Sequence, residues 1–279
     1  MHIVCCVKQV PDTAQVKIDP ETNTLIRSGV ESICNPYDLV AVEVGVQLAE
    51  KHGGKVTVIS MGPPQADSAL RDCLSLGATE AILLSDRAFA GADTLATSYT
   101  LATTISKISS VEPVDLVICG KQAIDGDTAQ TGPGIATRLG FNQFTYVAEI
   151  INVDSANGTI KIRRETETGS EIIEGKMPAL LTVELELAAP RYASLPHLVR
   201  ALREDVKVWG AANIDSAPER LGLKGSPTSV KVIFAPPVRK GGTVFDGGGD
   251  QVKAAGDFLK NFLEKEPALL KEIFTDHKG

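Results

Sequence analysis

The sequence predicts an α/β protein: a doubly wound, Rossmann-like parallel sheet with an added antiparallel portion and a C-terminal arm. Through residues 1–141, short apolar segments of strand length alternate with longer segments of helix length, the order typical of parallel sheets covered by helices on both faces. The run at residues 114–119 is apolar at all but one position, which indicates a strand buried on both faces. After Phe141 the pattern changes, and Asn157-Gly158 is a strong signal for an antiparallel hairpin.

The first strand is expected at residues 3–7. A helix is expected at residues 35–51, because Asn35 is a favoured N-cap, Pro36 suits the first helical position and glycines follow the helix end. Gly77 stops the next helix in the same way. Further strands of this part are expected at residues 56–60, 81–84 and 114–119. Further helices are expected at residues 65–76, 93–108 and 133–139.

The antiparallel portion is expected at residues 141–209. Strands at 144–153 and 159–164 should pair around the hairpin turn, and a further strand is expected at 177–187, with a short helix at 194–203. Beyond Trp209 the sequence is rich in glycine and proline. A terminal helix follows at 250–262, with an apolar stripe of Val252, Ala255, Leu259 and Phe262. We therefore expect a nucleotide-binding domain at 1–209 and an extension at 210–279 whose helix packs on a partner.

The composition favours a compact, cytoplasmic protein. The chain has 279 residues, enough to bury a sizeable core, and 43% of them are hydrophobic, near the globular norm. No apolar run reaches the roughly 18 residues of a membrane helix, and the first residues resemble a strand rather than a signal peptide, so we expect no membrane insertion. A net charge of -7 argues against a nucleic-acid-binding surface.

Neither the cysteines nor the histidines suggest a metal or catalytic centre. The 5 cysteines show no C-x-x-C spacing, and most lie where a thiol packs as a small hydrophobic group. A disulfide framework and an iron–sulfur site are therefore disfavoured. The 4 histidines are scattered, without the spacing of a metal site and without support for a Ser-His-Asp arrangement.

The most informative segment follows the strand at residues 114–119. The chain breaks at Gly120, runs through a small polar loop and resumes as a helix near Pro133, which suits the first helical position. Gly132 and Gly134 are expected to leave the backbone uncovered where a helix N-terminus collects unpaired N–H groups and partial positive charge. This pattern predicts a phosphate-binding site at the carboxyl edge of the sheet, although neither G-x-G-x-x-G nor G-x-x-x-x-G-K-[ST] is present.

Four segments, in order and at matching spacing, resemble the β subunit of electron-transfer flavoproteins. The signature of that family is a G-K-Q-A-I-D segment, here residues 120–125, followed by Q-T-G, here residues 130–132. The other matching segments are V-K-Q-V-P-D-T at 7–13, N-P-Y-D at 35–38 and P-R-Y-A-S-L-P at 190–196. The resemblance extends from Met1 to about Trp209.

The resemblance implies one half of a heterodimer whose α subunit carries a mobile FAD domain. In the ordinary type the β subunit binds a structural AMP. In the electron-bifurcating type of anaerobes it binds a second FAD that accepts hydride from NADH and passes electrons to the α-subunit FAD and to ferredoxin. Such a subunit is an electron carrier within an oxidoreductase complex, and the cofactor supplies the chemistry. The partners implied are the α subunit, an acyl-CoA dehydrogenase or lactate dehydrogenase, and ferredoxin.

Carried onto this sequence, the resemblance and the sheet-edge loops imply a set of cofactor-binding residues. These are Cys6, Asn35, Asp38, Met61, Gly62, Asp86, Gly91, Asp93, Thr94, Gln122, Ile124, Asp125, Gly126, Asp127, Thr128, Ala129, Gln130, Thr131, Gly132, Pro133 and Gly134. The diphosphate is expected between Thr128 and Gly134, with the adenosine near Cys6, Asn35, Asp38 and Met61. The isoalloxazine is expected toward Asp86–Thr94, where Gly91 would leave room for a ring system that AMP lacks.

Small departures from the ordinary type favour the bifurcating type. The ordinary type reads V-K-R-V after the first strand and D-D-D-C-N-Q-T-G-Q in the loop, whereas this sequence reads V-K-Q-V and D-G-D-T-A-Q-T-G-P. The long tail after Trp209 agrees with the bifurcating type, but P-R-Y-A-S-L-P follows the ordinary style. A nucleotide-sensing module of the universal-stress type has the same sheet topology and is the alternative from another functional class.

Some candidate residues also have ordinary structural interpretations. Asp125 and Asp127 are expected to act as turn or capping residues, or to contact ligand hydroxyls, rather than to bind metal. The resemblance implies docking roles for Glu165, which contacts a mobile domain of the partner subunit, and for Arg191, Tyr192 and Leu195, which lie on the segment that meets the dehydrogenase. Without the resemblance, Glu165 would belong to a solvated strand face and Leu195 to a helix core.

Overall fold

The computed structural model describes residues 1–12, 17–18, 25–26, 31–229 and 242–265. Strands and helices alternate through the first half of the chain, as the sequence predicts. The strands of this half are β1 (His2–Cys6), β2 (Gln9–Pro11), β3 (Lys17–Ile18), β4 (Leu25–Ile26), β5 (Ser32–Cys34), β6 (Lys55–Met61), β7 (Glu80–Leu84) and β8 (Leu116–Gly120). The helices are α1 (Pro36–His52), α2 (Asp67–Ser75), α3 (Thr94–Val111) and α4 (Thr131–Leu139).

The second half adds strands and short helices to the same sheet. Its strands are β9 (Asn142–Asp154), β10 (Thr159–Thr166), β11 (Gly169–Lys176), β12 (Ala179–Val183) and β13 (Lys207–Trp209). The α-helices are α5 (Leu195–Arg203) and α6 (Gln251–Lys265). Single turns of 3-10 helix join several elements: η2 (Pro64–Ala66), η3 (Arg87–Phe89), η4 (Leu185–Leu187), η5 (Ala211–Asn213), η6 (Pro218–Arg220) and η7 (Gly222–Gly225).

The described residues form a sheet with the strand order β11-β10-β9-β12-β8-β1-β6-β7-β13. Strand β1 is central and pairs in parallel with β6 on one side and β8 on the other. The chain first extends outward from β1 through β6 and β7, then crosses back to place β8 on the opposite side. This reversal of strand order between β1 and β8 is the topological switch point at which ligands bind in open α/β sheets.

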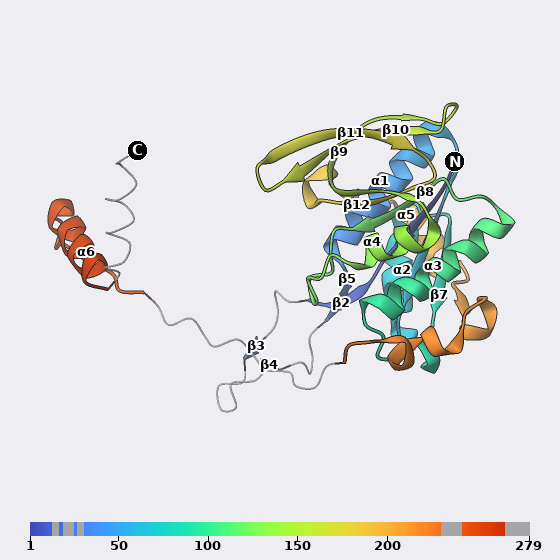
Figure 1. Ribbon diagram of the computed structural model, residues 1–279, viewed down its shortest axis with the longest axis horizontal. Helices are drawn as coiled ribbons and strands as arrows, with labels where there is room; N and C mark the ends of the chain where they lie inside the picture. Colours follow the sequence, from blue (N-terminus) through green and yellow to red (C-terminus); the bar gives the residue numbers. More distant parts are fainter. Residues whose placement is uncertain (13–16, 19–24, 27–30, 230–241, 266–279) are drawn as a thin grey trace. The chain divides into compact units, whose positions relative to one another are not determined.

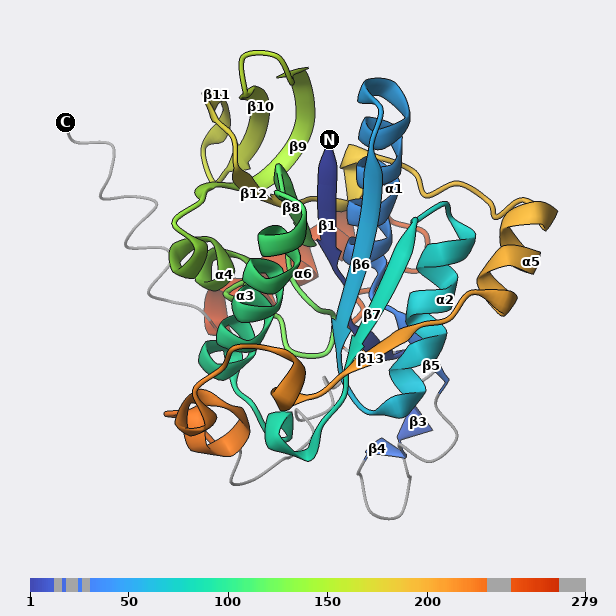
Figure 2. The same cartoon turned by 90° about the vertical axis from the view of Figure 1, so that its right-hand side faces the viewer.

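Helices cover both faces of this sheet, so the predicted doubly wound class is confirmed. Figure 2 shows the sheet between α3 and α4 on one side and α1 and α2 on the other. Successive side chains of β8 alternate between the faces: Ile118 belongs to the core beneath α1 and α2, and Val117 to the core beneath α3 and α4. Because both faces are buried, the strand is apolar at nearly every position, which is the pattern used to predict it.

The antiparallel portion is confirmed for the hairpin and corrected for the strand expected at 177–187. Strands β9, β10 and β11 form an antiparallel ribbon at one edge of the sheet (Figure 1). Strand β12, in contrast, lies parallel between β8 and β9, with Leu180 opposite Val117. All five of its residues are buried and all but Thr182 are apolar, a pattern that indicates a parallel position.

Two helix starts differ in detail from the predictions. Pro133 is the third residue of α4, which begins at Thr131, rather than its first. The N–H of a third helical residue also has no partner within its helix, so proline is tolerated there for the same reason. Asn35 precedes α1 as predicted, but its side chain makes no capping hydrogen bond to that helix.

Strands β11 and β13 were not predicted. Strand β11 is largely exposed, so hydrophobic periodicity is absent from it and its position depends on pairing with β10. Strand β13 has three residues and pairs with the edge strand β7, aligning Val208 with Leu83. Both strands are held by backbone pairing to segments distant in sequence, which local patterns do not report.

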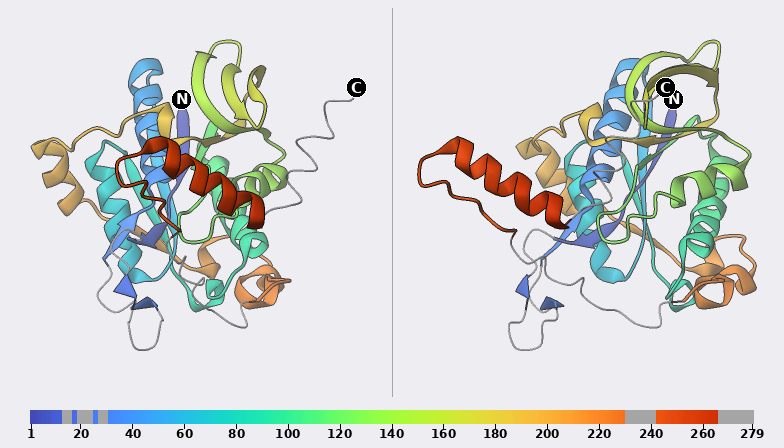
Figure 3. Two further views of the ribbon diagram at one scale, coloured as in Figure 1. Left: turned by 90° about the vertical axis from the view of Figure 1, so that its left-hand side faces the viewer. Right: turned by 60° about the vertical axis from the view of Figure 1, so that its left-hand side comes forward.

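The chain divides into two compact units, Met1–Ile233 and Phe234–Gly279. Within the second unit, α6 is one continuous helix (Figure 3), and the Asp250 carboxylate accepts hydrogen bonds from the N–H groups of Val252 (2.9 Å) and Lys253 (3.2 Å). Phe258 stacks on Phe262, one helical turn away. No helix among the described residues has the length and apolar character needed to cross a membrane. Residues 230–241 and 266–279 of the expected extension lie outside the described residues.

Candidate functional site

The largest described cavity, about 1040 Å³, opens at the carboxyl ends of β1 and β8. This is the switch point of the sheet, where the loops after the two strands diverge to opposite faces. Of the residues predicted to bind a cofactor, the cavity brings together Cys6, Asp38, Met61, Asp93, Thr94, Gln122, Gly126, Asp127, Thr128, Ala129, Gln130, Thr131, Gly132 and Gly134.

The buried carboxylate of Asp38 joins the two strand ends beneath the cavity. It accepts a hydrogen bond from the N–H of Lys8 (2.8 Å) after β1 and another from the N–H of Gly120 (3.1 Å) at the end of β8. Burial raises the pKa of Asp38 to about 7, although these hydrogen bonds act in the opposite direction. A Cβ on Gly120 would lie 2.4 Å from the carboxylate, so only glycine permits this approach.

Two clamps hold the loop after Gly120. The Asn35 side chain donates to the carbonyl of Gln122 (2.9 Å) and accepts from the N–H of Ile124 (3.2 Å). The Lys8 ammonium pairs with the Asp125 carboxylate at 2.7 Å. Asn35, Ile124 and Asp125 therefore do not line the cavity but position the loop that does. Because the Asn35 amide is used in this way, it is not available to cap α1.

The loop enters α4 through two residues with left-handed backbone conformations. Asp127 has φ 49° and Ala129 has φ 53°. Such conformations in residues other than glycine are uncommon and cost about 1 kcal/mol or more. Alternation of left- and right-handed residues turns successive N–H groups to one side, forming an anion-binding concavity. Neither Asp127 nor Asp125 caps α4, so the capping interpretation was wrong; the Asp127 carboxylate accepts from the Gln122 amide at 2.9 Å.

The start of α4 is the part of the cavity suited to a phosphate. Across the described residues, no protein acceptor pairs with the backbone N–H groups of residues 128–132. These groups meet the partial positive charge of a helix N-terminus at the cavity wall. Next to them, the Thr94 hydroxyl at the start of α3 donates to the Gln130 side chain at 3.1 Å.

The two glycines of α4 also have a packing role that was not predicted. A Cβ on Gly132 would lie 2.6 Å from the Thr182 methyl group of β12, and a Cβ on Gly134 would lie 2.8 Å from the Ser98 hydroxyl of α3. Their small size therefore allows α4 to approach the sheet and α3. The N–H of Gly132 remains among the unpaired groups at the phosphate site, whereas the N–H of Gly134 donates to the carbonyl of Gln130 at 2.9 Å.

The predicted ring-side residues Asp86 and Gly91 also have structural roles. Asp86 accepts hydrogen bonds from the N–H groups of Ala88 and Ala211, both at 2.9 Å. Gly91 has φ 70°, and a Cβ there would lie 2.6 Å from Leu223. The expectation that Gly91 leaves room for a ring system was wrong, because Leu223 fills that space. Gly62 and Pro133 likewise do not line the cavity.

Sequence reasoning did not find a segment beyond β13 that borders the cavity. Pro227 and Thr228 line it, and the Asp93 carboxylate accepts from both the N–H (3.1 Å) and the hydroxyl (2.8 Å) of Thr228. The other oxygen of Asp93 caps α3 by accepting from Leu95 and Ala96. The basic residues Lys8, Lys121 and Arg138 also line the cavity. Only Lys8 and Lys121 had a signal, because both directly follow strands.

The segment at 190–196 carries one anchored residue and two exposed ones. The Arg191 guanidinium pairs with Glu43 (2.9 Å), whose side chain is 3% exposed, and with Glu50 (2.7 Å), both on α1. Tyr192 is fully exposed and Leu195 is 73% exposed. The helix-core interpretation of Leu195 was therefore wrong. Arg191 ties the segment to α1, leaving Tyr192 and Leu195 to face outward.

Glu43→Gln is expected to lower the free energy of unfolding by about 1 kcal/mol, the difference between a charge-assisted and a neutral hydrogen bond. Burial alone would raise the pKa of Glu43, but hydrogen bonds from Arg191 outweigh it and lower the pKa below 4.5. A depressed carboxyl pKa contributes stability above the unfolded-state value, and that contribution is lost as the pH falls through the folded-state value.

The stability difference would be measured by thermal unfolding of the purified wild-type and Glu43→Gln proteins between pH 3.5 and 8, in steps of roughly one pH unit. The difference should be constant above about pH 5 and shrink below it. A difference that does not change with pH would show that the Arg191–Glu43 ion pair contributes no net stability. Glu171→Gln, on the exposed pair with Arg164 at 2.9 Å, is the control and should change stability little.

Glu165 lies on the exposed ribbon. Its carboxylate accepts from Arg163 at 2.7 Å, and Arg163 also pairs with Glu149 at 3.0 Å. The Glu165 side chain is 47% exposed. It is therefore accessible to a partner and already has an intramolecular ion pair that such a partner would have to displace.

Comparison with known proteins agrees with this arrangement. The electron transfer flavoprotein domain family matches residues 22–213. The chain is 49% identical over 279 residues to protein FixA of Azotobacter vinelandii, covering 99% of this chain and 96% of the relative. It is 51% identical over 266 residues to the electron transfer flavoprotein subunit beta of Clostridium acetobutylicum, covering 95% of this chain and 99% of the relative. The chain therefore belongs to the electron-transfer flavoprotein family, as a β subunit.

Proposed function

We propose that this β subunit binds FAD in the switch-point cavity and, with an electron-transfer flavoprotein α subunit, accepts hydride from NADH. Electrons would then pass to the α-subunit FAD and a partner dehydrogenase (an acyl-CoA or lactate dehydrogenase) and to ferredoxin. The observation that carries the proposal is the single large cavity running from the ends of β1 and β8, past the start of α4, to the start of α3.

The features of the cavity fit the parts of a flavin nucleotide. The free N–H groups of residues 128–132 and the adjacent helix N-terminus suit a diphosphate. Cys6, Asp38 and Met61 line the sheet-edge end, where we place the adenosine. Ala92, Thr94 and Leu95 line the part beyond the phosphate site, where we place the isoalloxazine. When bound, FAD supplies the ability to take up electrons as a pair and release them singly.

The protein itself contributes position and electrostatics to this chemistry. Asp38 fixes the separation of the two strand ends, and the Asn35 and Lys8 clamps hold the loop that presents its N–H groups. The cavity volume of about 1040 Å³ is at the upper end of the range for small-molecule sites, which favours a dinucleotide.

Structural AMP in the same cavity is the second candidate. The sheet-edge and phosphate parts of the cavity would suffice for it, and the docking segment P-R-Y-A-S-L-P follows the style of the AMP-binding type. A nucleotide-sensing module outside this family is disfavoured, since the chain belongs to the electron-transfer flavoprotein family.

The flavin content of the α–β heterodimer distinguishes these functions. We expect two flavins per heterodimer, and rapid loss of visible absorbance from the β-side flavin on adding NADH without any dehydrogenase. One flavin together with extractable AMP would identify the ordinary type. Two flavins per heterodimer with no response to NADH would support FAD binding in the cavity but would overturn NADH as the hydride donor.

We further propose that α6 packs on the α subunit. Several of its apolar side chains are exposed: Val252 (82%), Phe258 (49%), Leu259 (53%) and Leu263 (38%). A helix with so much exposed apolar surface is typical of one that completes its burial against a partner. The second unit would then serve assembly, while the first carries the cofactor.

A further inference from the structure

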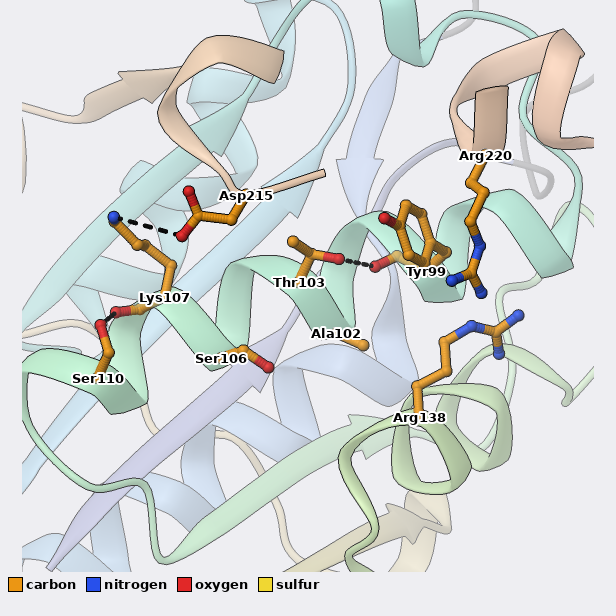
Figure 4. A pocket seen from close by; sticks show the side chains of 9 residues that line it. All are labelled: Tyr99, Ala102, Thr103, Ser106, Lys107, Ser110, Arg138, Asp215 and Arg220. Atoms are coloured by element: carbon orange, nitrogen blue, oxygen red, sulfur yellow. Dashed lines mark hydrogen bonds and ion pairs between the residues drawn. The ribbon is translucent and has the colours of Figure 1, made fainter. Parts of the chain in front are cut away.

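Two arginines lie near Tyr99, close to the beginning of α3, and share the walls of two small cavities with it. Figure 4 shows Arg220, from η6, and Arg138, from α4, with their guanidinium groups directed toward each other. The guanidinium carbon of Arg220 is 4.0 Å from the centre of the Tyr99 ring, a cation–π contact that fixes its position. The Tyr99 hydroxyl is itself held by the N–H of Ala217 at 2.8 Å.

Arg138 is half-buried and oriented by the backbone. Its two terminal nitrogens donate to the carbonyl oxygens of Gly134 (2.8 Å) and Leu95 (3.2 Å). Its Nε is buried and has no hydrogen-bond partner. Burial lowers the pKa of the Arg138 guanidinium, and the positive charge of Arg220 lowers it further. An arginine held in this way provides a fixed donor fork.

The positive charge at this place has no carboxylate partner. None of Arg138, Arg220 and the neighbouring Lys224 forms an ion pair with any described residue. Two carboxylates share the surrounding walls: Asp215, which pairs with Lys107 at 3.6 Å, and Glu219. In a chain with net charge -7, a half-buried arginine beside an exposed one, with no carboxylate pairing with either among the described residues, is a place suited to an anion.

The arginine pair adjoins the nucleotide cavity. Arg138 lines that cavity and also two smaller ones, of about 450 and 420 Å³, both of which Arg220 lines too. Leu95 and Pro227 are shared between the nucleotide cavity and the second of these. The guanidinium pair therefore lies directly beside the cofactor cavity, with Arg138 in the walls of both.

We propose that Arg138 and Arg220 form a phosphate-binding site for a nucleotide at the outer end of the cofactor cavity. Phosphate and diphosphate groups match the planar donor forks of arginine and carry the charge that the pair lacks. The phosphate has two possible sources: an exchangeable dinucleotide, namely NADH, or the nucleotide resident in the cavity. The assignment to NADH rests on the proposed function, whereas the phosphate site itself does not.

The test uses the α–β heterodimer with its resident nucleotide, and inorganic pyrophosphate as the first probe. Isothermal titration should show pyrophosphate binding to the wild type and about fivefold weaker binding to Arg220→Gln, a typical effect for an exposed charged donor. Arg220 is exposed, so the variant should fold, and Arg220→Lys should recover part of the affinity. Lys51→Gln removes one positive charge at the exposed end of α1 and should bind pyrophosphate like the wild type.

Further measurements separate the two sources. If NADH competes with pyrophosphate, and Arg220→Gln weakens NADH binding while the flavin content stays unchanged, the site binds the exchangeable dinucleotide. If the resident nucleotide is lost from Arg220→Gln during gel filtration, the site binds that nucleotide. Absence of NADH-dependent bleaching would refute the proposed function and leave the pyrophosphate result standing. Equal pyrophosphate affinity in the wild type, Arg220→Gln and Arg138→Gln would overturn the site, and so would absence of pyrophosphate binding together with full retention of the resident nucleotide in Arg220→Gln.

Discussion

Gln130→Glu is expected to weaken retention of the nucleotide in the β subunit by about tenfold to hundredfold, one of the two largest effects we predict. The substitution is isosteric, so the Thr94 hydroxyl can still donate to the same position, now 3.1 Å from a carboxylate oxygen. It places a negative charge at the start of α4, beside the unpaired N–H groups. Repulsion between a carboxylate and a nearby phosphate is worth about 2 kcal/mol or more in a partly solvated site, and every 1.4 kcal/mol or so is a factor of ten.

Gln130→Glu separates ligand binding from folding. An acidic residue at a helix N-terminus stabilises the helix, so the variant should unfold no earlier than the wild type. Gln143→Glu makes the same chemical change on the exposed face of β9, outside the cavity, and should retain its nucleotide. Nucleotide released by repeated desalting of the heterodimer would be quantified by absorbance. Equal retention in both variants would mean that the phosphate does not lie at the start of α4.

Substitution of Gly132 would not test the same point. A Cβ there would meet Thr182 of β12 at 2.6 Å, and any loss of nucleotide could follow from displacement of α4. The charge change at Gln130 avoids this ambiguity, because it alters the electrostatics without altering the packing.

Leu195→Ala is expected to weaken coupling of the heterodimer to its partner dehydrogenase by about tenfold or more. Leu195 begins α5, whose outward face also exposes Leu198 (43%), Val199 (38%) and Leu202 (75%). Fully burying a leucine side chain in a partner contributes on the order of 2 kcal/mol, and truncating an interface anchor typically costs at least that. The other face of α5 is fixed to α2 by Arg71, which donates to the carbonyl of Ala201 at 2.6 Å. The helix should therefore remain in place in the variant.

Coupling would be measured as the dependence of dehydrogenase-linked electron transfer on heterodimer concentration. Val111→Ala is the matched control, because Val111 is an apolar side chain that is 86% exposed at the opposite end of α3 from the cavity. It should couple like the wild type. Flavin content and response to NADH should be normal in Leu195→Ala, since the cavity residues are elsewhere. Normal coupling in Leu195→Ala would exclude the outward face of α5 as the docking surface.

The positions of the main elements were readable from the sequence because their causes are local. The helix expected at 93–108 is α3, and Asp93, a favoured N-cap residue, caps it. The run from Leu116 to Gly120 is buried on both faces, so its apolar character identified it as a strand. The loop with free N–H groups before α4 was also identified, because strand, small polar residues and helix follow one another within a short stretch. The family resemblance was likewise carried by motifs of a few consecutive residues each.

The roles of several side chains were decided by contacts between distant segments. Gly91 was expected to make room for a ring, but it accommodates Leu223. Asn35 was expected to cap the helix beside it, but it holds the loop at Gln122, 87 positions away. In each case the residue type suited the predicted role, and a partner brought close by the fold took it instead.

The sequence by itself thus determined the α/β class, the order of its main strands and helices, the loop that ends β8 and the family of the chain. The class and the order of the elements depend on hydrophobic period, capping and turn chemistry, which act over a few neighbouring residues, whereas the family was inferred from the resemblance of short motifs. Only the tertiary structure decided that β12 is a parallel strand beside β8, that Leu195 is exposed, and that Arg138 and Arg220 meet near Tyr99. Those outcomes depend on which segments meet once the sheet has formed, and no local pattern encodes the distance between residues that lie 82 positions apart.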